Sequence, residues 1–97
     1  MYIQHFPYLS EFLGGYFHQD AFDGAETDDD VIRDFIQTSH PYQRLGVRAD
    51  VQRFLHQHRG ELVKAMERAF APSVVLWENE ADLEAWLGKV DGMLTAG

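Results

Sequence analysis

The sequence contains no cysteine, which excludes disulfide cross-links and thiolate chemistry. It also lacks a long apolar segment: the longest strongly apolar run is residues 74–77, whereas a membrane-spanning helix needs about 20 such residues. The amino-terminal residues show no basic region followed by an apolar stretch, which is the pattern of a secretory signal. We therefore expect a cytoplasmic protein with no membrane partner.

Basic residues are scarce as well. Eight Lys and Arg stand against 16 Asp and Glu, and the formal net charge is −8. Residues 11–34 carry eight carboxylates and one arginine, and residues 78–91 carry five carboxylates and one lysine. Such a charge repels phosphate backbones, so the composition disfavours nucleic-acid binding. It would attract a basic protein partner, although acidity also serves solubility alone.

The length of 97 residues and the apolar fraction of 45% predict one compact domain, residues 1–97. Apolar residues recur at helical spacing in several stretches, and no convincing pair of alternating strands is present. We therefore predict an all-α fold with four to five short helices. The expected helices lie at about residues 8–14, 28–38, 42–58, 61–71 and 80–94.

Local signals predict where these helices begin and end. Ser10 is expected to cap the first helix and Gly14-Gly15 to end it. Thr27 and Asn79 are expected to cap the second and the last helix. The last helix carries the clearest apolar stripe and is expected at the centre of the core; the stripe consists of Leu83, Trp86, Leu87, Val90, Met93 and Leu94.

Two segments depart from this regularity. Seven of the thirteen aromatic residues lie within the first 22 positions, and we interpret this segment as wrapping across the helices and filling gaps in their core. Residues 16–26 are expected to be irregular. Residues 74–77 are compatible with a short buried strand or with an extended plug.

The first aromatic segment includes the run P-x-L-x-x-F-L-G-G-Y-F-H-Q-D at residues 7–20, followed by acidic residues and by Trp86-Leu87 near the carboxyl end. This layout resembles the immunity proteins of bacterial contact-dependent growth inhibition systems. The resemblance implies a small, non-enzymatic cytoplasmic protein that binds and neutralises the C-terminal toxin domain of a cell-contact effector or a related polymorphic toxin. Many such toxins are nucleases, and the resemblance does not say which toxin is bound.

An acidic cluster is the candidate partner-binding site. It lacks the twelve-residue calcium loop with glycine at the sixth position. Stabilisation of a helix dipole accounts for two or three of its carboxylates, and the excess favours docking of a basic protein surface. The cluster consists of Asp23, Glu26, Asp28, Asp29, Asp30 and Asp34. The most recognisable motif is expected to be mostly structural; it consists of Tyr16, Phe17, His18, Gln19 and Asp20.

Catalytic and metal sites are poorly supported. His18 and Asp20 form a two-residue signal, whereas a zinc site needs three or four ligands. His56 and His58 would point about 200° apart on a helix and could not share a metal. We therefore expect no metal, no cofactor and no enzymatic activity. Two alternatives remain: a generic acidic helical adaptor, and a small metal-dependent hydrolase that uses His18, Asp20 and the acidic cluster.

Overall fold

The computed structural model describes residues 6–17, 27–70 and 76–96. In these ranges the chain forms five α-helices and no strand, and the prediction of an all-α fold is confirmed. The helices are α2 (Pro7–Tyr16), α3 (Asp28–Thr38), α4 (Pro41–His58), α5 (Leu62–Phe70) and α6 (Glu80–Ala96). None of the helices in the described ranges is both long and apolar enough to cross a membrane.

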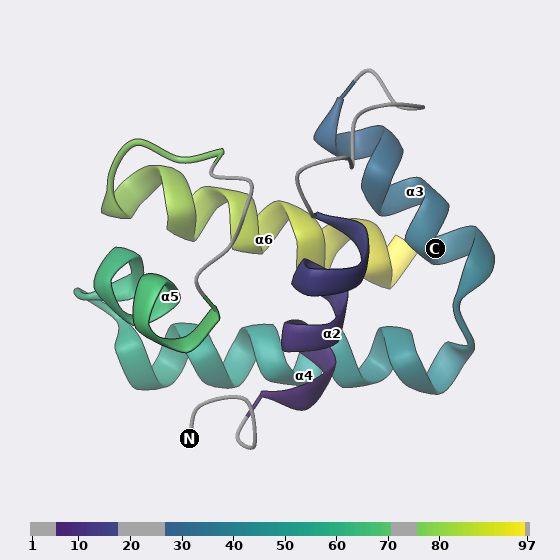
Figure 1. The fold of residues 1–97 in the computed structure, drawn as a ribbon, viewed down its shortest axis with the longest axis horizontal. Coiled ribbons are helices and arrows are strands. Elements are labelled where there is room, and N and C mark those ends of the chain that lie inside the picture. Colours follow the sequence, from purple (N-terminus) through teal and green to yellow (C-terminus); the bar gives the residue numbers. More distant parts are fainter. Residues whose placement is uncertain (1–5, 18–26, 71–75, 97) are drawn as a thin grey trace.

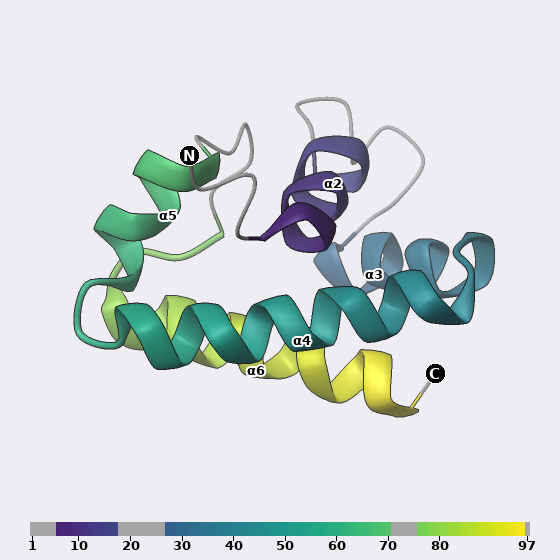
Figure 2. The same cartoon turned by 90° about the horizontal axis from the view of Figure 1, so that it is seen from below.

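The long helices α4 and α6 pack side by side and run antiparallel, and α2 crosses over this pair (Figure 1). Helices α3 and α5 lie toward opposite ends of the pair. Seen from below, α2 covers one side of α4, while α6 lies along another (Figure 2). The predicted central position of the last helix is confirmed, because α6 contacts α3, α4 and α5 and buries Leu83, Trp86, Leu87, Val90 and Leu94.

Helix α2 begins on a cap that another helix supplies. Its N-cap residue, Phe6, offers no side-chain acceptor. The buried carboxylate of Asp50 in α4 takes this role, because its Oδ2 accepts hydrogen bonds from the backbone N–H groups of Tyr8 (2.8 Å) and Leu9 (3.0 Å). Arg53 donates to the other oxygen of the same carboxylate. Asp50 therefore fixes where α2 sits on α4.

The prediction that Ser10 caps this helix is wrong. Pro7 occupies the first helical position, where its missing N–H costs nothing and its ring pre-sets φ. Ser10 consequently lies inside the first turns of α2, and its own N–H donates to the Phe6 carbonyl at 2.9 Å. The N–H groups at the start of α2 that need an outside acceptor are those of Tyr8 and Leu9, and they are bonded to Asp50.

The prediction that Gly14-Gly15 ends the first helix is also wrong, since α2 continues to Tyr16. Each glycine in a helix costs about 1 kcal/mol relative to alanine. Packing offsets this cost, because the Phe12 ring contacts the rings of Phe17 (5.2 Å between centroids) and Phe35 (4.8 Å). Tyr16 thus belongs to α2 and not to the expected irregular segment, of which residues 18–26 lie outside the described residues.

Helices α3 and α6 begin where the local signals place them. Thr27 Oγ1 accepts the Asp30 N–H, and Asp30 Oδ2 accepts the Thr27 N–H, both at 3.3 Å. At the start of α6, Asn79 Oδ1 accepts the Asp82 N–H at 2.9 Å. Both predicted caps are confirmed, and each hydrogen bond joins residues three positions apart in the sequence.

Helix α5 follows a tight turn at Gly60, whose φ of +92° lies in the region that favours glycine. The first N–H groups of α5, like those of α2, are capped by a side chain from another helix of the chain. The Glu80 carboxylate at the start of α6 accepts hydrogen bonds from Leu62 N (2.9 Å) and Val63 N (3.2 Å). Two of the five described helices therefore depend on a carboxylate that is distant in sequence.

The segment at residues 74–77 is only partly described. Leu76 and Trp77 belong to no helix or strand, and the question of a short strand at residues 74–75 falls outside the described residues. Trp77 is buried, and its ring centroid lies 5.5 Å from that of Trp86. Trp77 therefore packs against α6.

Candidate functional site

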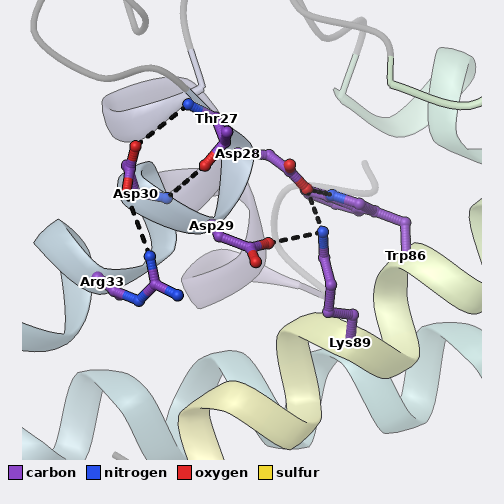
Figure 3. A network of polar contacts seen from close by, with 7 residues as sticks. All are labelled: Thr27, Asp28, Asp29, Asp30, Arg33, Trp86 and Lys89. Carbon is purple, nitrogen blue, oxygen red and sulfur yellow. Dashed lines mark hydrogen bonds and ion pairs between the residues drawn. The ribbon is translucent and has the colours of Figure 1, made fainter.

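The first turn of α3 carries three consecutive aspartates, and two of them bind α6 (Figure 3). Asp28 Oδ2 accepts hydrogen bonds from the indole Nε1 of Trp86 (2.9 Å) and from Nζ of Lys89. The Asp29 carboxylate pairs with the same ammonium group at 2.8 Å. These contacts join residues 58 to 61 positions apart in the chain and hold α3 against α6.

Asp30 is engaged within α3 itself. Its carboxylate closes the capping box with Thr27 and pairs with Arg33 at 3.1 Å (Figure 3). Asp34 differs, because it is exposed and no side chain in the described ranges binds its carboxylate. The carboxylates of the predicted acidic cluster therefore differ in whether they have partners within the protein. Asp28, Asp29 and Asp30 make internal contacts, Asp34 faces solvent, and Asp23 and Glu26 lie outside the described residues.

The contacts around Lys89 shift two pKa values. Partial burial alone would raise the pKa of Asp28, but hydrogen bonds from Lys89 and Trp86 hold it below its usual range. Burial alone would likewise lower the pKa of Lys89, whereas hydrogen bonds to Asp28 and Asp29 raise it. In both residues the charged form is favoured, so the ion pair persists throughout the neutral pH range.

These shifts predict a pH-dependent effect of the Asp28→Asn substitution. The pKa of Asp28 is lower in the folded protein than in the unfolded chain, where it is about 4. Its carboxylate therefore stabilises the fold fully at a pH above the unfolded pKa, and this stabilisation is lost as the pH falls through the folded pKa. We expect Asp28→Asn to lower the free energy of unfolding by about 1 kcal/mol at neutral pH, because the charged pair is partly exposed.

Urea unfolding of both proteins across an acidic pH series measures this difference. The deficit of the Asp28→Asn variant should shrink and disappear below the folded pKa of Asp28. At alkaline pH the same reasoning applies to Lys89, whose pKa is higher in the folded protein than in the unfolded chain, where it is about 10.4. Its stabilising effect is complete below the unfolded pKa and is lost as the pH rises through the folded pKa. A deficit that stays constant from neutral to strongly acidic pH would contradict the assigned ion pair.

A second feature is a small notch between α2, α3 and α4. Its volume is about 50 Å³. Glu11 is the charged residue of its lining; it is exposed and has no side-chain partner in the described ranges. The predicted cluster did not include Glu11, although its spacing of three residues from Tyr8 on one helical face is readable from the sequence. The notch is lined by Tyr8, Glu11, Phe12, Tyr16, Phe35, Gln43 and Val47.

The Tyr8 wall of the notch rests directly on the backbone of α4. A Cβ atom placed on Gly46 would lie 2.3 Å from Cγ of the Tyr8 ring, so only glycine permits this approach. Tyr8 is 37% exposed. Tyr42, one turn before Gly46 on the same side of α4, is 61% exposed. Two tyrosine rings therefore reach solvent on this side of α4.

The opposite wall of the notch belongs to Tyr16. Its ring packs edge-on against Phe35 with centroids 4.9 Å apart, and its hydroxyl hydrogen-bonds to Thr38 Oγ1 at 2.9 Å. Asp34 lies one turn before Thr38 on α3, so its exposed carboxylate stands on the same side. Phe17, the next residue of the recognised motif, is buried against Trp86 at 5.3 Å. His18, Gln19 and Asp20 lie outside the described residues.

A larger open groove of about 520 Å³ lies where α5 meets α6. Two of the three carboxylates in its lining already have partners. Glu80 caps α5, and Glu61 pairs with Arg68 at 3.6 Å. The groove is lined by Gly60, Glu61, Val63, Lys64, Glu78, Asn79 and Glu80.

The histidines of the described ranges do not form a metal site. His56 is exposed, whereas His58 is half-buried beside the rings of Phe6 and Phe54, so the two face different surroundings. Across the described ranges, no three His, Asp or Glu side chains converge on one point.

The chain was compared with known proteins. The sequence model of one protein family, described as CdiI immunity protein, matches residues 5–94. No curated protein and no solved structure matches the chain.

Proposed function

The chain belongs to the CdiI immunity protein family, and on that basis we propose that it binds and neutralises the cognate toxin domain of a contact-dependent growth inhibition system. The observation that carries this proposal is the family match over residues 5–94, which spans nearly the whole chain. In this function the chain is an inhibitor and performs no catalysis.

The mechanism we propose is masking of a basic surface. A nuclease toxin must hold the phosphates of its substrate, and this requires a positively charged surface. The net charge of −8 allows the chain to occupy such a surface in place of the substrate. Complementary charge also accelerates the encounter of the two proteins. We therefore propose a nuclease as the toxin and its active site or substrate-binding surface as the region covered.

The acidic segment is the proposed contact region of this chain: Asp23, Glu26, Asp28, Asp29, Asp30 and Asp34. Its first aspartates have a structural role as well. Lys89 and Arg33 partly neutralise them and leave a smaller local charge for a partner. The exposed carboxylate of Asp34 has no such competitor in the described ranges, and we expect it to contribute more directly.

Protection of growing cells tests this function. Cells that express the toxin domain encoded directly upstream should stop growing, and co-expression of this chain should restore growth. A second, unrelated toxin domain serves as the specificity control and should remain toxic. Failure to rescue, with both proteins folded and expressed, would overturn the proposal and leave the adaptor reading, in which the acidic surface binds some other protein.

A further inference from the structure

We propose that the notch between α2, α3 and α4 receives one basic side chain, an arginine or a lysine, from the toxin domain. This inference rests on the proposed function and specifies where the partner docks. Of the notch and the groove between α5 and α6, the notch is the one that combines an unpaired carboxylate with aromatic walls. Tyr8, which lines it, is itself partly exposed.

The size of the notch determines what kind of group can enter. Its volume of about 50 Å³ is far below the roughly 300–1,000 Å³ of pockets that hold small molecules. It matches the end of one side chain. The occupant is therefore part of a larger partner whose remaining contacts lie outside the notch, on the surrounding surface.

The lining selects a cation. Glu11 supplies a negative charge that no side chain in the described ranges neutralises. The rings of Tyr8 and Tyr16 flank the recess, with Phe12 and Phe35 below them. Aromatic rings attract guanidinium and ammonium groups most strongly where water is excluded. An apolar side chain would leave the Glu11 carboxylate without a partner, so a basic one fits better.

The surrounding surface suits a protein partner. Binding energy at interfaces concentrates in aromatic and arginine contacts near the centre, ringed by polar groups. Tyr42, one turn before Gly46 on α4, adds an exposed ring beside Tyr8, and the carboxylate of Asp34 stands on the α3 side. This arrangement places an acidic rim beside an aromatic centre. The net charge of −8 is the complement of a basic toxin surface.

Two substitutions that each remove one negative charge test the carboxylate. Glu11→Gln removes the charge from the notch, and Glu67→Gln removes one from an exposed position on α5. Both variants have the same net charge. Isothermal titration with the purified toxin domain should show a dissociation constant at least about tenfold higher for Glu11→Gln and little change for Glu67→Gln. The salt dependence of binding should also be flatter for Glu11→Gln.

A pair of glycine substitutions tests the aromatic wall. Gly46→Ala must displace the Tyr8 ring, because the Tyr8 backbone is held by Asp50. Gly88→Ala in α6 meets no atom within 4 Å. Gly46→Ala should weaken toxin binding by roughly tenfold or more, while Gly88→Ala should bind as the wild type does. Circular dichroism and thermal unfolding establish that each variant is folded at the temperature of the titration.

The outcomes separate the notch from the proposed function. If wild-type protein does not bind the toxin domain, both proposals fall. If the wild type binds and the folded Glu11→Gln and Gly46→Ala variants bind equally well, the toxin docks elsewhere and only the notch is overturned. If these two variants alone lose affinity and their controls do not, the notch is supported.

Discussion

Replacing Asp50 with alanine is expected to lower the free energy of unfolding by about 3–5 kcal/mol. The substitution removes the acceptor for the N–H groups of Tyr8 and Leu9 and leaves them without a partner at the start of α2. It also deprives Arg53 of its carboxylate. Because Asp50 is only 2% exposed, water cannot easily replace the lost contacts. Urea unfolding followed by far-UV circular dichroism measures the loss.

Asp91→Ala is the matched control for this prediction. Asp91 also pairs with an arginine of α4, Arg48, at 3.1 Å, but both side chains are more than a quarter exposed. Its loss should cost about 1 kcal/mol or less, as for most exposed ion pairs. Asp50→Asn retains one acceptor oxygen and should fall between the two alanine variants. Equal losses for Asp50→Ala and Asp91→Ala would show that α2 does not depend on this cap.

Trp86→Ala is expected to produce a loss of similar size, about 3–5 kcal/mol. The indole ring is 7% exposed and packs against Phe17 and Trp77, with centroids 5.3 and 5.5 Å away. Its Nε1–H donates to Asp28 and so links the core to the start of α3. The alanine variant therefore loses a large buried surface and a hydrogen bond together.

Trp86→Phe separates these two contributions. Phenylalanine retains most of the ring packing but cannot donate to Asp28, so the expected loss is smaller, about 1–2 kcal/mol. Denaturant unfolding of both variants provides the comparison. A loss below about 1 kcal/mol for Trp86→Ala would show that this ring is not part of the core.

The helices that the sequence predicted best are those with local signals. Thr27 and Asn79 cap helices through bonds that span three residues, and such patterns can be read directly from a sequence. The start of α2 could not be read in this way. Its cap, Asp50, lies 41 and 42 residues away from the groups that it binds, and only the folded arrangement of α2 on α4 brings them together.

The same distinction applies to the candidate site. The charge distribution along the sequence located the acidic segment, but it could not distinguish carboxylates with internal partners from carboxylates that face solvent. Lys89 lies 61 residues from Asp28, so no local pattern indicates that this aspartate is engaged inside the molecule. Glu11 was counted among the acids and was not singled out, because the role proposed for it depends on the aromatic recess that α3 and α4 complete around it.

The central claim is that this chain binds the toxin domain through its acidic surface, which includes the acidic segment and Glu11. Isothermal titration of the wild-type chain with the purified toxin domain, repeated over a salt series, tests the claim most directly. We predict a saturable complex whose affinity falls steeply as the salt concentration rises, because opposite charges meet in the interface. The absence of binding at low salt, or an affinity that does not change with salt, would contradict this account.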